Sequence, residues 1–407
     1  MTLRSAVDQE IRDLIQKHGR ITFARFMQTC LYSPWGGFYS SRAQRISTHF
    51  GTSSLSHPVF GALIARQLEQ MWQLLGEPCV FHVIEVGCGD GALAQSIVHA
   101  CWRTAPEFAE ALYYVAADYE PRRPLSSDPV ADWDHGTGVW ASSRPDAISG
   151  IQRVKTEGLW AFRNVVGCVL SNELIDNFPV HRFAIQDGRV KEVFVTLADG
   201  NLTEVLDEPS TACIEERITS LGLSLPEGYR GEVNLALEGW TRQVAGALDR
   251  GFVLTIDYGE QASDLYAAGN NEGTLVCYQQ HAAGNDPYQA IGQQDITCHV
   301  DFTTLTRLGE RHGLATVGYT AQRQFLTNLG FSSFLDALDT QGLSPARTTL
   351  SRMAMMALVD PEEYGDLKVL VQAKGNGLGN ELLGFASDTT SENKGAASQS
   401  ARSAELP

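Results

Sequence analysis

The sequence has no C-x-x-C pair and no cluster of histidines, and its eight cysteines lie far apart. It therefore indicates neither a structural zinc site nor a disulfide framework, and we expect no metal. No segment reaches the roughly 20 apolar residues that a membrane helix needs, and the N-terminal residues lack the apolar core of a signal peptide. We expect no membrane association and a reducing compartment: the cytoplasm, or the mitochondrial matrix if the chain is eukaryotic.

Basic residues are also scarce. The chain has 31 Lys and Arg against 48 Asp and Glu, a net charge of -17. A protein that binds nucleic acid must neutralise phosphates with basic side chains, so we expect no nucleic-acid partner. With 407 residues, 43% of them hydrophobic, the chain is long enough to form a full α/β core and a further element.

Apolar residues at helical spacing predict two helices before Ser33-Pro34, and Pro58 suits the first turn of another that runs to about Leu75. We expect an N-terminal helical segment with an aromatic loop over 1–76 and a nucleotide-binding core over 77–260. Loop-rich elements and the last strands follow over 261–385, with loops dominating to about Gly330. Residues 386–407 have no apolar pattern and are expected to be a disordered tail.

Strands and helices alternate from Val80 onward, which predicts a mostly parallel sheet covered by helices. The apolar strands expected in it are Phe81 to Ile84, Leu112 to Ala117, Val165 to Leu170, Phe252 to Ile256 and Leu367 to Gln372. Alternating runs from Phe183 to Leu206, separated by Asp-Gly turns, predict an inserted antiparallel β-meander. Residues 121–160 have too little periodicity to locate a further strand.

A glycine-rich segment, Glu85-Val-Gly-Cys-Gly-Asp-Gly91, follows the first of these strands and precedes a helical pattern. A strand that ends at glycines and is followed by a helix brings bare backbone next to a ligand. Asp118 closes the next strand, where an acid can accept hydrogen bonds from a ribose diol.

The glycines alone leave the ligand open, because Gly87, Gly89 and Ala92 also satisfy the dinucleotide pattern G-x-G-x-x-A. Asp90, however, lies among the amides that a pyrophosphate needs, and its charge repels phosphate. S-adenosylmethionine carries a sulfonium and an ammonium, which carboxylates attract. The turn therefore favours S-adenosylmethionine, and a nicotinamide dinucleotide is the more distant alternative.

The segment Ser171 to Pro179 follows another strand at the carboxyl edge of the sheet, where ligands of open α/β sheets bind. Asn172, Glu173 and Asp176 are its candidate site residues. Paired carboxylates suit a guanidinium acceptor, because they accept its forked donors and can take a proton from it. Glu173 and Asp176 stand three apart, close enough to face one acceptor. The alternative is a helix N-terminal capping cluster.

Two later segments add candidates. Asp257-Tyr258-Gly259 ends a further strand at the same edge and is expected to help close the cavity. Residues 273–302 form a long loop that is too aromatic for disorder. His281 within it could act as a base near neutral pH, with a loop hydrogen-bonding role as the alternative.

These motifs together resemble the MidA-like methyltransferase family, over most of the chain up to about residue 375. The resemblance rests on Leu31-Tyr32-Ser33-Pro34, Gly37-Phe38-Tyr39, Thr52-Ser53, His57-Pro58-Val59-Phe60-Gly61, the glycine segment, Ser171 to Phe183, Gly251 to Gly259 and Gly273 to Phe302. One departure is Asp118-Tyr119-Glu120, where the family has Glu-x-Ser.

The resemblance implies a class I methyltransferase fold, Rossmann-like, with an N-terminal helical segment, extra elements over the acceptor site and S-adenosylmethionine as cofactor. In the family's pattern the cofactor is held by residues that correspond here to Glu85, Gly87, Gly89, Gly91 and Asp118. Asn172, Glu173 and Asp176 correspond to the acceptor-facing element.

The family includes a mitochondrial arginine methyltransferase that assists the assembly of respiratory complex I, so the resemblance implies a protein arginine as acceptor. We therefore expect a methyltransferase in which Glu173 and Asp176 orient a guanidinium. A small-molecule acceptor, and a non-catalytic assembly factor that retains the fold, are the alternatives. The sequence does not determine the oligomeric state.

Overall fold

The computed structural model describes residues 5–40, 57–119, 139–142, 150–156, 162–279, 282–340, 342–378 and 382–386. The expected disordered tail lies outside the described residues, apart from Ala386. Thr52-Ser53, which contributes to the family resemblance, also lies outside them.

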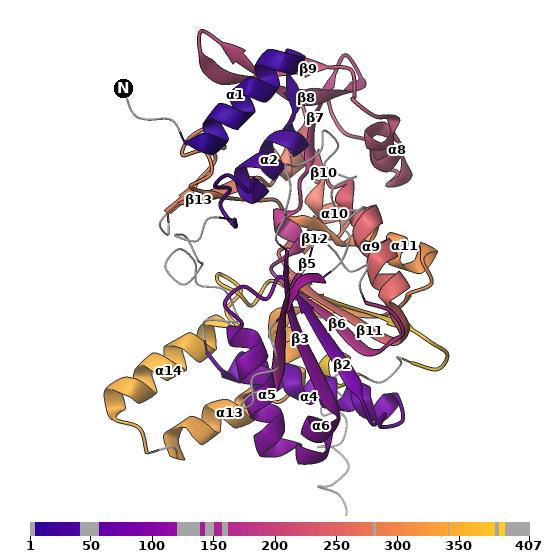
Figure 1. The fold of residues 1–407 in the computed structure, drawn as a ribbon, viewed down its shortest axis with the longest axis vertical. Helices are drawn as coiled ribbons and strands as arrows, with labels where there is room; N and C mark the ends of the chain where they lie inside the picture. The colour runs from indigo at the N-terminus through magenta and orange to yellow at the C-terminus, as the bar shows by residue number, and fades with distance from the viewer. Residues whose placement is uncertain are drawn as a thin grey trace, which may run out of the picture.

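An eight-stranded sheet forms the centre of the molecule, in the order β17-β18-β11-β6-β2-β3-β5-β4 (Figure 1). Neighbours from β11 through β6, β2 and β3 to β5 run parallel, whereas β18, β17 and β4 join antiparallel. The strands are β2 (Phe81–Val86), β3 (Leu112–Tyr119), β4 (Val139–Ser142), β5 (Ile151–Thr156), β6 (Val165–Asn172), β11 (Leu248–Asp257), β17 (Ala315–Ala321) and β18 (Lys368–Lys374). The expected mostly parallel α/β architecture is confirmed.

The strand order reverses direction at the centre of this sheet. From β2 the chain proceeds outward through β3 to β5, and then returns to the other side of β2 to form β6 and β11. Such a switch point leaves a crevice at the carboxyl ends of the two central strands, which is where open α/β sheets bind ligands. The glycine segment follows β2 and Glu173 follows β6, so the topology brings both predicted motifs to this crevice.

Helices cover both faces of the sheet because its strands are apolar on both sides. Val83 belongs to a core with α4, α5 and α6, whereas its neighbour Ile84 belongs to a second core with α9 and α11 on the opposite face. The helices around the first core are α4 (Val59–Leu74), α5 (Ala92–Thr104), α6 (Pro106–Ala111), α12 (Gln322–Asn328), α13 (Phe331–Ala337) and α14 (Pro345–Ala357), and those of the second are α9 (Ala236–Ala247) and α11 (Phe302–Arg311).

A second sheet lies beyond the carboxyl edge of the first, in the upper part of Figure 1. The expected meander is present as antiparallel β7, β8 and β9, and the sheet is extended by β1 and β10. The elements of this region are α1 (Ala6–His18), β1 (Ile21–Thr22), α2 (Phe23–Tyr32), β7 (His181–Gln186), β8 (Arg189–Ala198), β9 (Asn201–Asp207), α8 (Ala212–Ser220) and β10 (Arg230–Val233).

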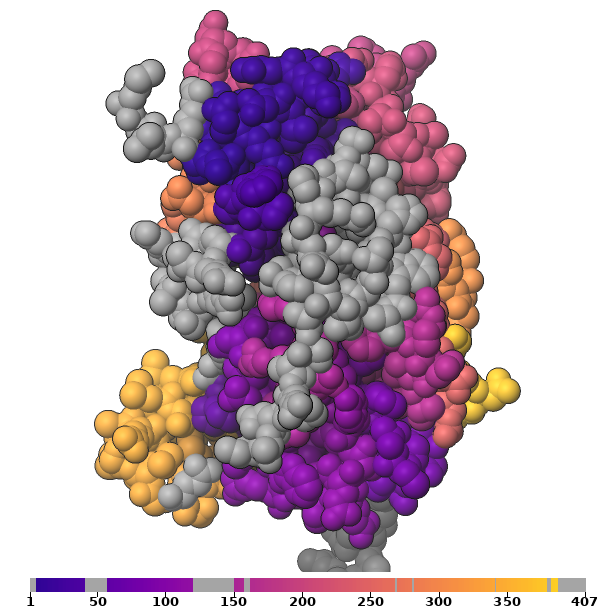
Figure 2. All heavy atoms as spheres, in the orientation of Figure 1, coloured from indigo at the N-terminus to yellow at the C-terminus, as the bar shows by residue number. Residues whose placement is uncertain are grey.

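The N-terminal helices and the meander form one body, because β1 between the helices pairs with Phe194 and Val195 of β8. Figure 2 shows the same arrangement in space-filling form, with the N-terminal helices and the meander at one end of the molecule and α13 and α14 standing out near the other. The inserted strands thus support the N-terminal segment against the edge of the central sheet.

The structure differs from the sequence-based expectation in two regions. Residues 121–160, where no strand could be located, contain β4 and β5. The stretch after Gly259, expected to be loop-rich to about Gly330, is regular in its second half, where α11, β17 and α12 follow one another. Its first half does consist of short elements: β12 (Gly259–Glu260), α10 (Ala262–Leu265), β13 (Val276–Gln279), β14 (Ala282–Gly284), β15 (Asp295–Thr297) and β16 (Val300–Asp301).

Candidate functional site

A cavity of about 480 Å³ lies at the carboxyl edge of the central sheet. Its walls come from the glycine segment, the turn after β6, the residues around Tyr39 that follow α2, and the 276–299 segment. Predicted site residues that line it are Glu85, Gly87, Gly89, Asp118, Asn172, Glu173 and Asp176. Gly91 is the N-cap residue of α5 and is not among the lining residues. His281 lies outside the described residues.

The glycine turn has a backbone that only glycine adopts without strain. Gly87 has φ +77°, and a Cβ placed on it would lie 2.7 Å from Cδ1 of Leu174 in the turn after β6. The turn is tied to the end of β3, because the amides of Gly87 and Cys88 donate to the carbonyl of Ala117 at 2.9 and 3.2 Å. The absence of a side chain at residue 87 thus lets the two central strand ends approach each other.

These hydrogen bonds also bear on the ligand. The amides of Gly87 and Cys88 are already used, and Oδ1 of Asp90 accepts from the amide of Ala92 at 3.0 Å, at the start of α5. A pyrophosphate needs free amides and an uncapped helix N-terminus. These three amides are therefore not available to a phosphate, which argues against the dinucleotide alternative.

Carboxylates flank the turn on both sides. Glu85 is buried at the end of β2 and accepts from the hydroxyl of Tyr114 at 2.8 Å. Burial is the main reason that its pKa is raised to about 7. Asp118, at the end of β3, is partly exposed, and its Oδ2 lies 2.6 Å from Nζ of Lys155. The edge near the glycines thus presents two carboxyl groups to the cavity, and Asp118 is the one paired with a lysine.

The turn after β6 is held by a buried acid on the neighbouring strand. Glu173 has φ +48°, which is uncommon for a residue with a side chain, and its amide donates to the carbonyl of Ile256 at 2.9 Å. Oδ2 of Asp257 accepts from the amides of Leu174 and Ile175 at 3.1 and 2.8 Å. Asp257 is fully buried and does not line the cavity, so its role is to fix this turn, which turns Glu173 and Asp176 toward the cavity.

Asp176 has the most unusual environment of the candidate residues. It is 5% exposed, and its Oδ1 has no hydrogen-bond partner among the described residues. Burial, and then the charges of Asp257, Asp295 and Glu173, raise its pKa well above the usual value. A buried carboxylate oxygen without a donor is costly, and such strained groups are concentrated at functional sites.

A further acid, Asp295, lies beside this turn. The hydroxyl of Tyr39 donates to its Oδ2 at 2.7 Å, and Nδ2 of Asn177 donates to its Oδ1 at 3.0 Å. Asp295 is buried, and burial raises its pKa to about 7. Its bonds link the loop after α2, the turn after β6 and the 276–299 segment, which are three parts of the cavity wall.

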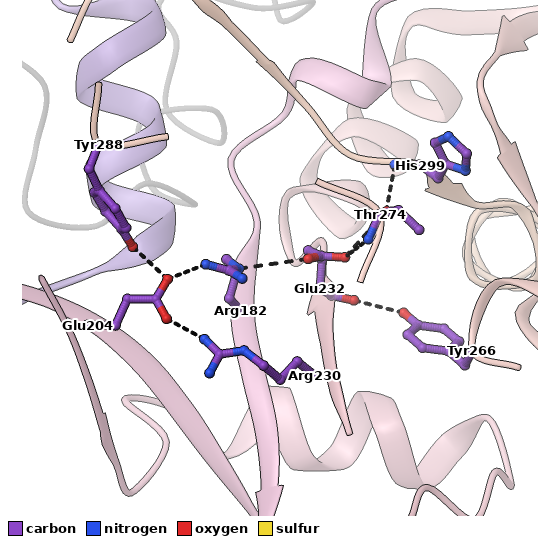
Figure 3. A network of polar contacts seen from close by, with 8 residues as sticks. All are labelled: Arg182, Glu204, Arg230, Glu232, Tyr266, Thr274, Tyr288 and His299. Carbon is purple, nitrogen blue, oxygen red and sulfur yellow. Dashed lines mark hydrogen bonds and ion pairs between the residues drawn. The ribbon is translucent and has the colours of Figure 1, made fainter. Parts of the chain in front are cut away.

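The 274–299 segment is anchored to the second sheet by a network of buried and partly buried polar side chains (Figure 3). Oε2 of Glu232 on β10 accepts from the amide of Thr274 at 2.9 Å and from its hydroxyl at 3.3 Å. The hydroxyl of Thr274 in turn accepts from the amide of His299 at 3.1 Å. Tyr288, in the middle of the segment, donates to Oε1 of Glu204 on β9 at 2.9 Å. The second sheet therefore holds the segment at Thr274 through β10 and at Tyr288 through β9, and Thr274 in turn holds His299 at the end of the segment.

The charged residues that line the cavity are acidic. Of the described residues that line it, none is Lys or Arg. The acidic lining residues are Glu85, Asp90, Asp118, Glu173, Asp176, Asp295, Glu362 and Glu363, and the aromatic ones besides His299 are Tyr32, Phe38, Tyr39, Tyr119, Tyr258, Tyr278 and Tyr364. Carboxylates and aromatic faces both attract cations. The cavity is therefore suited to positively charged ligands.

Some lining residues were not identified as candidates from the sequence. Asp295 lies in the aromatic 273–302 loop and Tyr39 in the Gly37-Phe38-Tyr39 motif, and an acid in an aromatic loop was the available signal. Glu362, Glu363 and Tyr364 follow α14 and have no local motif. His299, which was not a candidate, also lines the cavity and is stacked on Tyr258 with ring centroids 6.5 Å apart. Burial lowers the pKa of His299, so this ring is neutral near pH 7.

Two absences apply to the described part of the chain. No group of His, Cys, Asp and Glu side chains there is arranged to hold a metal ion. Among the same residues, no helix has the length and apolar character required to cross a bilayer.

The chain matches a family model over residues 63–320, and that family is described as "Putative S-adenosyl-L-methionine-dependent methyltransferase". Among solved structures, it is similar to a Burkholderia thailandensis protein crystallised with S-adenosyl-homocysteine, with a TM-score of 0.77, 27% identity and coverage of 94% of each chain.

Curated relatives extend the same similarity. The Drosophila melanogaster protein named mitochondrial protein arginine methyltransferase NDUFAF7 homolog is 26% identical over 379 residues, which cover 88% of this chain and 82% of the fly protein. The human protein arginine methyltransferase NDUFAF7, also named as mitochondrial, is 23% identical over 366 residues, covering 86% of this chain and 79% of the human protein.

Proposed function

The chain belongs to this family of S-adenosyl-L-methionine-dependent methyltransferases, and from that premise we propose that it methylates the guanidinium of an arginine in a protein. The donor follows from the family. The acceptor is our inference, and the carboxylate-rich cavity without Lys or Arg among its described lining residues carries it.

We assign the donor to the part of the cavity next to the glycine turn. When bound, S-adenosylmethionine supplies a methyl group on a positively charged sulfur. The turn fits this ligand because its glycines allow close approach, its first amides are not free for phosphate, and Glu85 and Asp118 supply negative charge nearby. Asp118 would accept from the ribose through the oxygen that Lys155 does not hold. Gly89 lines the same part of the cavity, whereas Gly91 is the N-cap residue of α5.

We assign the acceptor to the part of the cavity next to Glu173 and Asp176. A guanidinium is a planar cation with five N–H donors, and it needs several acceptors in a confined space. Oδ1 of Asp176 is an acceptor that still lacks a donor among the described residues. Asn172 donates from Nδ2 to Oε1 of Glu173 at 3.2 Å, which orients that carboxylate for the same ligand.

The chain's contribution to the reaction is then orientation and proton removal. Methyl transfer breaks the S–C bond and forms an N–C bond, and the acceptor nitrogen must lose one proton for its charge to balance. Holding the reacting atoms in line can lower a barrier by about 7 to 11 kcal/mol in favourable cases. Asp176 and Glu173 are placed to accept the proton, and Asp295 lies beside them as a further buried acid.

The proposal is tested by transfer of labelled methyl from S-adenosylmethionine into an extract of cells that lack this protein. Protein and small-molecule fractions are counted separately, and the labelled protein is hydrolysed. Label released as methylarginine supports the proposal. Label in the small-molecule fraction contradicts the protein acceptor, and binding of S-adenosyl-homocysteine without transfer to any fraction favours a non-catalytic assembly factor.

The cellular location belongs to the same proposal. The curated relatives are named as mitochondrial proteins, whereas for this chain a cytoplasmic location remains a prediction. Fractionation of the source cells, with the protein detected by antibody, tests it directly.

A further inference from the structure

The loop between α14 and β18 forms part of the cavity wall. Glu362, Glu363 and Tyr364 all line the cavity, and both glutamates are solvent-exposed. Residues that are exposed and line a cavity lie at its mouth. Neither carboxylate has an ion-pair or hydrogen-bond partner among the described residues. The mouth of the cavity thus carries two adjacent negative charges that no described residue neutralises.

The backbone of this loop is well held. The amide of Glu362 donates to Oδ1 of Asp360 at 3.0 Å, and the amides of Glu363 and Gly365 donate to the carbonyl of Asp360 at 3.1 and 2.8 Å. The amide of Tyr364 donates to the carbonyl of Ala357 at 3.2 Å. The backbone that carries the two glutamates is therefore fixed at the cavity mouth.

Other acids near the loop do have basic partners. Asp366 pairs with Arg323 at 2.9 Å and with Lys368 at 3.1 Å, and Lys368 also contacts Glu260 at 2.7 Å. Arg323 and Lys368 are thus paired with Asp366 and Glu260, and among the described residues no basic side chain pairs with either glutamate at the mouth.

A second observation points to a cationic ligand that enters past this mouth. Inside the same cavity, Oδ1 of Asp176 is buried and lacks a hydrogen-bond donor among the described residues. A cation that reaches Asp176 passes from an acidic mouth to an acidic interior. The two sites are therefore suited to different parts of one positively charged ligand.

We propose that the acceptor arginine lies in a basic segment of its protein, and that Glu362 and Glu363 bind Lys or Arg residues close to it in sequence. The inference rests on the proposed function, because it takes the arginine at Asp176 as given. An extended chain advances about 3.3 to 3.6 Å per residue, so neighbours within a few positions of the arginine can reach the mouth while its side chain occupies the cavity. Glu362 and Glu363 are then residues that determine substrate specificity.

The experiment compares methylation of short synthetic peptides that have one central arginine flanked by Lys, by Gly or by Glu. The native protein is compared with the double variant E362Q/E363Q. The variant E215Q/E216Q is the matched control, because it removes two adjacent exposed acids from α8, away from the cavity lining. Glutamine keeps the shape of the side chain, and both pairs lie on the surface, so folding should be preserved.

We expect the lowest KM for the Lys-flanked peptide. In E362Q/E363Q that KM should rise by about 2- to 30-fold, the range for two exposed ion pairs, while kcat and the control variant stay unchanged. Added salt should reduce the preference. If the peptides are methylated at arginine with equal KM, or if the preference persists in E362Q/E363Q, the inference is wrong and the proposed function stands. If no peptide is methylated at arginine, both fail.

Discussion

Replacement of Asp176 by Asn separates function from stability at this site. Asp176 is almost completely buried, so solvent screens little of its interaction with a bound cation. A hydrogen bond to a charged group contributes about 1.5 to 3 kcal/mol, which corresponds to about a 10- to 150-fold change in rate. We therefore expect kcat/KM for the arginine acceptor to fall by that factor in Asp176→Asn. Binding of S-adenosyl-homocysteine, assigned to the other side of the cavity, should remain unchanged.

The same substitution should not destabilise the fold. The pKa of Asp176 is raised by burial and by neighbouring acids. A carboxyl whose pKa is raised on folding destabilises the native state once the pH exceeds its pKa in the unfolded chain, about 3.9. Asn removes this penalty, so the free energy of unfolding of the variant, relative to the native protein, should increase as the pH rises from about 4 to neutrality.

The assay combines methyl transfer to a Lys-flanked arginine peptide, calorimetric titration with S-adenosyl-homocysteine, and urea unfolding at several pH values. Asp301→Asn is the control: Asp301 is similarly buried, but it caps α11 by accepting from the amide of Thr304 at 3.0 Å and does not line the cavity. It should transfer methyl at the native rate. Full activity in Asp176→Asn, or a loss that is matched by unfolding, would refute the role assigned to Asp176.

Three further predictions concern other parts of the cavity. The acceptor KM should fall as the pH rises from about 6 to about 8. Burial raises the pKa of Asp295 to about 7, so this carboxyl gains the negative charge that attracts a cation as the pH passes that value. A KM that is flat or rises over this range, at constant ionic strength, would contradict this prediction. Glu232→Gln should raise the acceptor KM without changing the affinity for S-adenosyl-homocysteine, because it weakens the hydrogen bonds that anchor Thr274. The control Glu192→Gln alters a buried acid bonded to His181 and Ser210 instead, and it should leave both values unchanged. Equal effects of the two variants would argue against a role for the Thr274 anchor. Gly87→Ala should weaken the binding of S-adenosyl-homocysteine measured by calorimetry. A non-glycine residue at φ +77° is destabilised by roughly 1 to 2 kcal/mol, and the added Cβ would clash with Leu174. Native affinity in a folded variant would show that this turn does not contact the cofactor.

The parts of the fold that the sequence predicts well have strong local signals. The apolar runs before Glu85, Asp118 and Asn172 are buried on both faces of the sheet and lie at its centre. Asp187-Gly188 and Asp199-Gly200 form the turns of the meander as expected, with both aspartates and both glycines at positive φ. Motifs at strand ends could be located because parallel strands bring their carboxyl ends to one edge.

Regions with weaker signals were missed for physical reasons. β17 is an edge strand whose residues are all partly or fully exposed, so its sequence lacks the apolar alternation of a buried strand. α11 did have a signal, because Asp301 is its N-cap and Phe302, Leu305 and Leu308 form its buried stripe. The aromatic residues before it made the whole stretch resemble a loop.

The acidic mouth of the cavity could not be predicted from local sequence. Glu362 and Glu363 lie far along the chain from Asp176, and they reach the same cavity only because β18 returns antiparallel to β11. The unpartnered Oδ1 of Asp176 likewise depends on which side chains surround it. Such features follow from the tertiary arrangement of the sheet and not from any motif.

The proposed acceptor site is tested most directly by a crystal structure of the protein with S-adenosyl-homocysteine and a Lys-flanked arginine peptide. We expect the S-adenosyl-homocysteine sulfur beside the Gly87 turn, and the guanidinium within hydrogen-bond distance, about 3 Å, of Asp176 and Glu173. A guanidinium bound elsewhere, with the cofactor in this cavity, would show that Asp176 and Glu173 do not hold the acceptor.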